Sequence, residues 1–405
     1  MSSHPHDEET ASTTPGRFSA VEPLDRLQGA FPAVFAPPTH GHPRVLPTTS
    51  VGRRRASSAG ASLDQDEHLP EKVIEQQEQG ISVSETAARD QTVLYLAYGS
   101  NMASATFLGR RGIKPLSQIP VLVPGLRLTF DLPGLPYLEP CFAATRVRKP
   151  LAQEEDNSNE TDSTDEDLLS EKAGLLETER VQRSDYHEHR WHKPLIGVVY
   201  EVTLADYAKI IATEGGGRGY LDVVIDCYPF AEDYKPTDPV PAHPRTSLFK
   251  AHTLLSPGAD ETRDTPLSMT TQITPKWPMF DVGQHMRPDP EYAQPSARYL
   301  NLIVTGAGEH DLPVSYREYL SQIQTYKITT TRQKIGKVIF LALWGPIVLL
   351  VLKLSRHCAG PDGRNPPWLV ALANFKFVVL WASYDYVFKG LFGDGERTLT
   401  DTNAA

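Results

Sequence analysis

The fold is decided by one stretch of the sequence, Tyr95-Leu96-Ala97-Tyr98-Gly99-Ser100-Asn101-Met102. Apolar residues from Val93 to Ala97 fall on both faces of an extended chain, which predicts a strand buried on both sides. Gly99 can take φ > 0 and lets a ligand approach the backbone, while Ser100 and Asn101 place side-chain hydrogen-bonding groups beside backbone N–H groups. Such a turn suits an anion. It is also ordinary strand-to-helix turn chemistry, so this stretch alone leaves both readings open.

Residues 1–90 of this 405-residue chain are rich in Pro, Ser, Thr, His and charge and lack a sustained apolar period. This composition predicts a disordered N-terminal arm, in which Arg53-Arg54-Arg55 could act as a local tag or kinase signal. The N-terminus has neither the basic nor the apolar region of a secretory signal, so we expect synthesis in the cytosol. A formal net charge of −10 argues against a general nucleic-acid binder.

The globular part is expected to run from about residue 91 to about residue 330. Alternation of apolar and polar residues predicts strands over 126–130 and 220–228, and β-branched content predicts one over 195–202. Strands are also expected over 141–147, as a partner of 126–130, and over 248–255. Helix patterns predict helices over 103–108, 204–214, 296–307 and 311–323. Two stretches with little to bury are expected to be insertions, an acidic one at about 150–190 and a Pro-rich one at about 231–290.

Glu214 is a candidate proton carrier. Thr203 is a suitable N-cap for the helix before it, with Asp206 at the acidic position of a capping box, and Gly215 ends that helix. Glu214 therefore falls in the last turn, where the negative end of the helix dipole would favour its protonated form and raise its pKa. The alternative is an ordinary solvated Glu at a helix end. The glycine run 215–219 is no P-loop, because no Gly-Lys-Ser/Thr follows it.

Taken together, four segments in order resemble the gamma-glutamylcyclotransferase family. They are the YGSN loop at 98–102, the GxxY strand at 197–200, the Glu-Gly pair at 214–215, and a C-terminal signature at 295–300, 306–307 and 312–316. The resemblance covers about 92–148, 193–230 and 290–325. It implies an α+β fold, a small mixed β-barrel with packed helices.

The resemblance also implies a reaction. The α-amino group of a γ-glutamyl unit attacks its own side-chain amide, which releases an amine and 5-oxoproline. The loop Tyr98–Met102 would hold the α-carboxylate, and Glu214 would carry the proton to the leaving nitrogen. Tyr220 and Tyr299 match positions where the family places hydroxyls near the substrate. The reaction needs no metal and no cofactor.

The C-terminal part departs from the compact family pattern. Residues 335–355 are apolar on all sides and long enough to span a bilayer, although a core helix of a soluble protein would look similar. Residues 368–392 are apolar but contain Asn374, Lys376, Asp385 and Lys389, so they could span or lie in the interface. A tail of 393–405 follows. With no signal peptide and thiol-bearing substrates made in the reducing cytosol, we expect the catalytic domain to face the cytosol.

The sequence predicts no metal site. Cys141, Cys227 and Cys358 are widely separated, and neither the histidines within 187–192 nor His40 and His42 lie on a scaffold that would fix ligand geometry.

Two functions remain open at this level. The first is a membrane-tethered cyclotransferase, similar to fungal forms in pathways such as gliotoxin biosynthesis. The second is a non-catalytic, membrane-anchored protein of the same fold that binds a γ-glutamyl ligand. The presence of Glu214 favours the enzyme. The substrate and the oligomeric state do not follow from the sequence.

Overall fold

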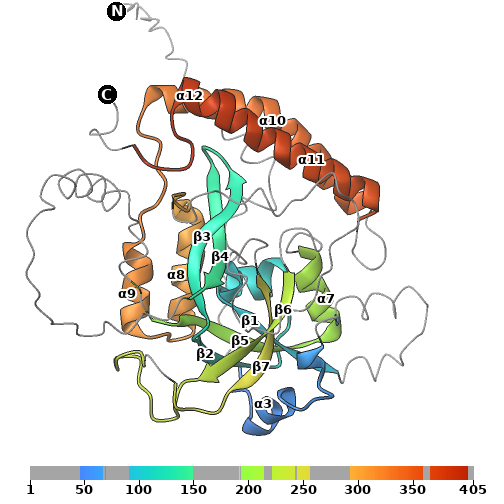
Figure 1. Ribbon diagram of the computed structural model, residues 1–405, viewed down its shortest axis with the longest axis vertical. Coiled ribbons are helices and arrows are strands. Elements are labelled where there is room, and N and C mark those ends of the chain that lie inside the picture. The colour runs from blue at the N-terminus through green and yellow to red at the C-terminus, as the bar shows by residue number, and fades with distance from the viewer. Residues whose placement is uncertain are drawn as a thin grey trace, which may run out of the picture. The chain divides into compact units, whose positions relative to one another are not determined.

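The computed structural model describes residues 46–66, 69, 91–148, 191, 193–213, 221–241, 244–255, 292–358 and 365–399 (Figure 1). Within these residues five strands form a closed barrel in the order β1-β5-β2-β6-β7. The strands are β1 (Thr92–Ala97), β2 (Ser117–Val123), β5 (Leu195–Thr203), β6 (Leu221–Pro229) and β7 (Phe249–Leu255). Neighbours are antiparallel except β1 and β7, which pair in parallel through Tyr95 and His252. The predicted α+β class with a small mixed barrel is confirmed.

Two of the barrel strands differ from the sequence-based expectation, β2 in its existence and β7 in its place. Strand β2 was missed because Pro120 in its middle argues against a strand. Its pairing with β6 is confined to Val121 and Leu122, which leaves Pro120 outside that ladder. Strand β7 was placed within an insertion, but it pairs with β6 along its whole length and belongs to the barrel.

A separate two-stranded sheet is formed by β3 (Leu126–Leu135) and β4 (Glu139–Val147), with an irregularity between Thr129 and Leu132. The turn between the two strands contains Tyr137 in the left-handed region, at φ 64°. Tyr137 is buried, although most residues with this backbone conformation are glycines at exposed turns.

The helices that cover the barrel follow their sequence signals. Helix α7 (Leu204–Thr213) is capped by Thr203, whose Oγ1 accepts a hydrogen bond of 3.2 Å from Asp206 N. The Asp206 carboxylate does not turn back to the cap, because its Oδ2 accepts from Lys114 N at 3.0 Å. Two helices follow β7 in the chain, α8 (Ala297–Glu309) and α9 (Val314–Gln322).

Part of the expected disordered arm is folded, and that prediction is wrong for residues 46–66. Helix α3 (Val51–Ser57) and the 3-10 turn η1 (Leu63–Gln65) pack on β7. Arg53, predicted to be a tag in a disordered arm, donates to both carboxylate oxygens of Asp64, at 2.6 and 3.1 Å, and to Glu201 Oε1 at 3.2 Å. Asp64 Oδ1 also accepts from Leu94 N at 2.6 Å, so this segment supplies a partner to β1.

The C-terminal apolar stretches form a helical hairpin, α10 (Thr331–Cys358), α11 (Pro367–Ser383), the π-helical η5 (Tyr384–Phe388) and α12 (Lys389–Phe392). Arg332 Nη2 donates to Leu391 O at 2.8 Å and Trp344 Nε1 to Ser383 Oγ at 3.0 Å, so the two arms run antiparallel. Two segments are long and apolar enough to cross a membrane, Thr331–Ser355 with a mean hydropathy of 2.4 and Pro367–Phe392 with 1.2. By length and composition alone this is weak evidence for a membrane span.

The predicted C-terminal tail is not loose over its first residues. Residues 393–399 return to the rest of the fold, where Tyr137 N donates to Gly395 O at 2.8 Å and Gln294 N to Glu396 O at 2.9 Å, and the Glu396 side chain is fully buried. A short polar stretch after an apolar helix has no periodicity that would reveal these contacts, because Tyr137 and Gln294 lie far away in the sequence.

Candidate active site

The predicted binding loop follows β1 directly and is held from several sides. Tyr98 donates its hydroxyl hydrogen to Leu254 O at 2.7 Å, across the β1–β7 seam. The 3-10 turn η2 (Ser100–Met102) follows, with Met102 N donating to Gly99 O at 3.1 Å. The first N–H groups of a helical turn have no acceptor within the turn itself, so those of Gly99 and Ser100 are the groups that an anion would use.

Gly99 lies outside the left-handed region of the backbone, and a methyl group there would meet its neighbours at ordinary contact distances. Its φ of −109° corrects the expectation of φ > 0. A Cβ at this position would lie 3.4 Å from Ala143 Cβ and 3.5 Å from the hydroxyl oxygen of Tyr299. Any larger side chain would therefore fill the space next to the Tyr299 hydroxyl.

Helix α8 lies along this loop. Tyr299, Ile303, Gly306 and His310 recur at helical spacing and so share one side of the helix. A Cβ at Gly306 would lie 2.6 Å from both Met102 C and Ala103 N. Only glycine allows α8 to approach the loop backbone this closely.

Tyr299 is fixed at the start of α8. Ser296 caps the helix by accepting from Tyr299 N at 3.0 Å. The Tyr299 hydroxyl oxygen accepts from Ala143 N of β4 at 3.1 Å, and the ring meets Phe142 edge-on, with centroids 5.0 Å apart. The hydrogen bond from Ala143 N therefore fixes the position of the Tyr299 hydroxyl oxygen.

The far end of α8 holds the continuation of the loop. Glu309 Oε2 accepts from Ser104 N at 2.7 Å and Oε1 from Ser104 Oγ at 2.9 Å, where the π-helix η3 (Ala105–Arg110) begins. His310 Nε2 lies 2.9 Å from Met102 O and 2.7 Å from the Tyr200 hydroxyl. Because a carbonyl only accepts, His310 donates through Nε2.

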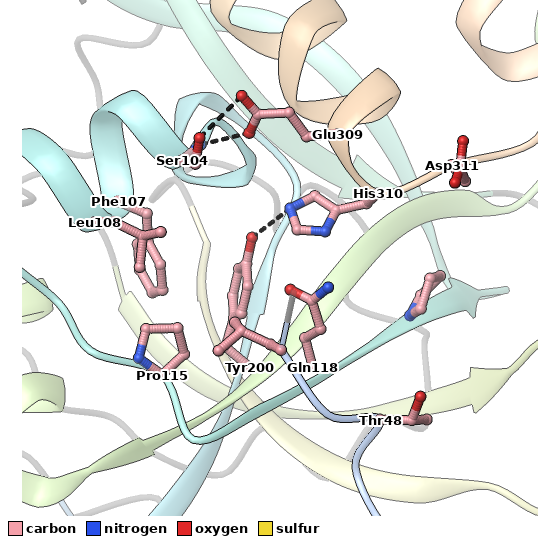
Figure 2. A pocket seen from close by; sticks show the side chains of 12 residues that line it. Thr48, Ser104, Phe107, Leu108, Pro115, Gln118, Tyr200, Glu309, His310 and Asp311 are labelled. Carbon is pink, nitrogen blue, oxygen red and sulfur yellow. Dashed lines mark hydrogen bonds between the residues drawn. The ribbon is translucent and has the colours of Figure 1, made fainter. Parts of the chain in front are cut away.

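Figure 2 shows the contacts of His310 and Glu309 beside a cavity of about 410 Å³. Burial lowers the pKa of His310, so its ring is neutral at neutral pH. Burial also raises the pKa of Tyr200, whose ring stacks on Phe107 at 4.5 Å between centroids. The neutral side chains of His310 and Tyr200 therefore hold the loop in place at Met102, which is a structural role.

The predicted site residues divide into two groups. Tyr98 to Met102 and Tyr299, about two hundred positions apart in the chain, come together. Glu214 and Tyr220 lie outside the described residues, in the connection from Thr213 at the end of α7 to Leu221 at the start of β6. Their roles stay predictions.

Sequence reasoning missed Ala143, Glu309 and His310, which position the loop and Tyr299. The only available signal was that Glu309 and His310 lie between the Gly306-Ala307 and Leu312-Pro313 parts of the family signature. Among the described residues there is no group of three His, Cys, Asp or Glu side chains that could hold a metal ion. The histidines at 187–189 and 192 lie outside those residues.

The arrangement can bind a carboxylate and orient a polar substrate. Backbone N–H groups at the start of η2 offer donors, and the Tyr299 hydroxyl lies beside them.

Burial raises the pKa of Cys141, which is fully buried in β4 next to this region, so its thiol stays protonated and unreactive.

Comparison with known proteins adds independent information. The family model described as the AclK C-terminal domain matches residues 330–391, which cover the helical hairpin. A protein of Aspergillus oryzae named gamma-glutamyl cyclotransferase aclK is 30% identical over 320 residues, which cover 76% of this chain and 91% of that protein. The gamma-glutamyl cyclotransferase gliK of Aspergillus fumigatus is 28% identical over 305 residues, 75% of this chain and 89% of that one.

Solved structures are also similar to parts of the chain. A human protein described as uncharacterized is 15% identical, with a TM-score of 0.32, and the match covers 60% of this chain and 94% of that one. A structure named gamma-glutamyl cyclotransferase has the same identity of 15% and TM-score of 0.32, with 59% and 92% covered.

Proposed function

Because this chain belongs to the gamma-glutamyl cyclotransferase family and is an enzyme of that class, we propose that it releases 5-oxoproline from a γ-glutamyl amino acid, peptide or glutathione-derived thiol adduct. The observation that carries this proposal is the meeting of the loop Tyr98–Met102 with Tyr299. A loop that presents backbone donors beside a fixed hydroxyl suits the α-carboxylate end of a γ-glutamyl unit. The non-catalytic alternative has no support from the relatives, whose names are those of enzymes.

The proposed reaction is an intramolecular transfer in which all atoms are retained. The α-amino nitrogen forms a bond to the side-chain carbonyl carbon, and the bond from that carbon to the leaving nitrogen breaks. The attacking ammonium loses two protons on its way to the ring N–H. Glu214 takes one of them and gives it to the departing nitrogen, and the released amine takes up the other. Holding the substrate folded, with the two reacting atoms in contact, supplies much of the rate for closing a five-membered ring.

The roles of individual residues are assigned as follows. The N–H groups of Gly99 and Ser100 bind the α-carboxylate, and Asn101 helps to set the shape of the turn through its hydrogen bond of 2.9 Å to the Tyr95 hydroxyl. Tyr299 donates its hydroxyl hydrogen to the substrate. Tyr220 does the same from the connection before β6.

The chemical identity of the leaving group is a separate part of the proposal. The two relatives from Aspergillus species support a role in fungal metabolism, and we extend this to secondary metabolism in which a glutathione-derived thiol adduct loses its γ-glutamyl group. No cofactor takes part in the proposed reaction.

We also propose that the enzyme is held at a membrane with its catalytic domain in the cytosol. The antiparallel hairpin supports this, because α10 starts and α12 ends beside each other. If both arms cross, the catalytic domain and the residues after α12 lie on the same side. Lys327, Arg332 and Lys334 precede or open the first arm, but Lys353 and Arg356 lie at its other end, so the basic residues alone do not set the orientation. The cytosolic side is proposed because thiol-bearing γ-glutamyl substrates are expected to be made in the reducing cytosol.

The function is tested by incubating the full chain, in detergent micelles, with γ-glutamyl amino acids, glutathione, glutathione S-conjugates and γ-glutamylamines, and by measuring 5-oxoproline. We expect release from at least one class, and the class identifies the leaving group. Absence of 5-oxoproline from every class, with a folded protein, would contradict the proposed function.

A further inference from the structure

Residues Gly393–Leu399, named the C-terminal strap here, lie where the helical hairpin meets the catalytic domain. Buried polar residues gather at this junction. They are Glu139, Gln294, Ser296, Gln333, Asp394 and Glu396. Burying polar and charged groups is unfavourable unless they are bonded to one another, so their bonding partners define what the strap holds together.

The strap is bound first to the hairpin that precedes it. Gly393 ends α12 in the left-handed region, at φ 87°, which turns the chain back. Gln333 Nε2 of α10 donates to Asp394 O at 2.7 Å, and the Tyr384 hydroxyl to Asp394 Oδ1 at 3.3 Å. Lys389 lies 3.3 Å from Asp394 Oδ2 and partly balances its charge.

The strap is bound next to the segment that leads into α8. The Tyr292 hydroxyl donates to Asp394 Oδ2. Gln294 N donates to Glu396 O at 2.9 Å, and Gln294 Oε1 accepts from Thr398 N at 2.8 Å. Two residues after Gln294, Ser296 caps the helix that contains Tyr299.

The third partner is the β3–β4 turn. Tyr137 N donates to Gly395 O at 2.8 Å, and its hydroxyl donates to Gly393 O at 2.9 Å. Two residues further on, the buried Glu139 accepts from Arg298 Nε at 2.7 Å and from the Ser296 hydroxyl. The strap therefore holds both sides of the start of α8, the segment before it and the strand beside it.

We propose that the C-terminal strap is a positioning element of the active site and that Asp394 is its main positioning residue, acting on Tyr299 through Tyr292 and the segment that leads from Tyr292 to the cap residue Ser296. This inference rests on the proposed function of Tyr299. It means that the segment after the hairpin does more than end a membrane anchor, because it sets the position of a hydroxyl in the substrate site.

Asp394 is suited to this role because its one carboxylate joins the strap to the hairpin, through Tyr384 and Lys389, and to the segment before α8, through Tyr292. Its Oδ1 accepts from Glu396 N at 2.7 Å and Arg397 N at 2.9 Å, which folds the strap back on itself, while Oδ2 receives Tyr292. An Asn has nearly the same shape but replaces one acceptor oxygen by an NH₂ group. With the NH₂ group toward Glu396 N and Arg397 N, it loses the acceptor for the strap's own turn. With the NH₂ group toward Tyr292, the Tyr292 hydroxyl loses its acceptor and can only accept in return, and in both orientations the charge that faces Lys389 is gone.

The test uses the full chain in detergent micelles, with Asp394→Asn compared with the control Asp385→Asn, an exposed Asp of η5 in the same C-terminal region. The first readout is hydrogen exchange of backbone amides. We expect faster exchange over residues 292–300 in Asp394→Asn, with β5 still protected, and no change in Asp385→Asn. Equal exchange over 292–300 in all three proteins would overturn the proposal.

The second readout is a double-mutant cycle with Tyr299→Phe. Asp394→Asn should lower kcat/KM for 5-oxoproline release by roughly 10- to 100-fold, the size expected when a contact group moves by up to about 1 Å. If it acts through Tyr299, it should cause little further loss when Tyr299 is already Phe. Losses that multiply would mean that the strap stabilises the fold without positioning Tyr299.

Tyr292→Phe provides a milder variant should Asp394→Asn fail to fold. It removes only the hydroxyl that faces Asp394 and should change both readouts in the same direction by less. Wild-type exchange and kcat/KM in Tyr292→Phe would overturn the proposal. The exchange readout does not depend on turnover. A wild type that releases no 5-oxoproline would therefore count against the proposed function, while exchange would still decide the role of the strap.

Discussion

The hydroxyl oxygen of Tyr299 lies 3.5 Å from the point that a Cβ at Gly99 would occupy. Space at this point is therefore shared between the loop backbone, the Tyr299 hydroxyl and whatever the site binds. In Gly99→Ala the methyl group would make ordinary contacts, whereas in Gly99→Val two further carbons would enter the substrate space. We expect Gly99→Val to lower kcat/KM by about 10²-fold or more, mainly through KM, and Gly99→Ala to lower it less.

Steady-state kinetics of 5-oxoproline release would measure this difference. Gly125→Ala is the control, because nothing lies within 4 Å of a Cβ at that position. Unchanged kinetics in Gly99→Val would mean that the loop is an ordinary turn.

The assignment of Glu214 predicts that Glu214→Gln folds normally and loses turnover. Gln keeps the shape but cannot carry a proton, so kcat should fall by roughly 10²- to 10⁴-fold, as is typical when a general acid or base is removed. Glu318→Gln, at an exposed position on α9, should keep wild-type activity. Near-normal 5-oxoproline release by Glu214→Gln would remove this residue from the mechanism.

Gly306 and Gly308 form a matched pair within α8. A Cβ at residue 306 would lie 2.6 Å from the loop backbone, whereas one at residue 308 would meet nothing within 4 Å. Gly306→Ala should therefore lower the free energy of unfolding by about 1–3 kcal/mol. Gly308→Ala should leave it unchanged or raise it by up to about 1 kcal/mol, since Ala favours a helix. Denaturant titration of both variants checks this, and equal stabilities would show that α8 can move away from the loop.

His310 predicts how stability depends on pH. Burial lowers the pKa of His310 below its ordinary value of 6.5, so between the two values the unfolded chain binds more protons than the folded one. The stability from keeping this ring neutral is present above about pH 6.5 and is lost as the pH falls below it. Between pH 7.5 and pH 5.5 we expect the melting temperature of His310→Gln to fall less than the melting temperature of the wild type.

His252 does not obscure this test. Its burial lowers its pKa, but the hydrogen bond and charge of Asp222 outweigh burial, and the net shift is upward. Its contribution is therefore present at low pH and is lost as the pH rises, the opposite sign to His310. Both proteins in the comparison contain His252, so their difference isolates His310. An identical drop in both would exclude a neutral, buried His310.

The exposed apolar side of the hairpin predicts membrane association. Leu343 and Leu350 of α10 are 51% and 57% exposed, so charges placed there would oppose lipid contact without disturbing buried packing. The double variant Leu343→Glu, Leu350→Glu should move from the membrane pellet to the supernatant after gentle lysis, while Leu248→Glu, on the barrel side, should not. Wild-type protein wholly in the supernatant would overturn the anchor.

Orientation is a separate question. In sealed vesicles with the cytosolic face outward, added protease should digest the catalytic domain. A protected domain would place it on the other side of the membrane.

Local signals were sufficient to predict the loop and most of the barrel. The strand before Tyr98 is apolar on both faces, the cap at Thr203 is a short-range contact, and alternation marks the central strands. These features depend on residues within a few positions of one another. For that reason the sequence could indicate both the α+β class and the segments that form the site.

What could not be predicted depends on distant partners. Nothing near Arg53 indicates that Asp64 and Glu201 would bury it, so a polar segment looked disordered. Glu309 is 205 positions from Ser104, and Asp394 is 102 from Tyr292. A carboxylate in a polar stretch has no pattern that distinguishes a buried partner from a solvated one, and single-sequence reasoning assigns it to the surface.

The contact between Asp64 and Leu94 N bears on how this enzyme could be divided for experiments. A fragment beginning at Thr92, where the barrel's own strands start, would lack the carboxylate that accepts from β1 and the Leu63 carbonyl that lies 2.9 Å from His252 Nε2. The β1–β7 seam would then keep its single parallel pair, the hydrogen bond of the Tyr98 hydroxyl and that of the Thr253 hydroxyl to Leu96 O at 3.2 Å. Crystallisation or NMR of a shortened enzyme should therefore use a fragment that begins before Leu46, some fifty residues ahead of the first barrel strand.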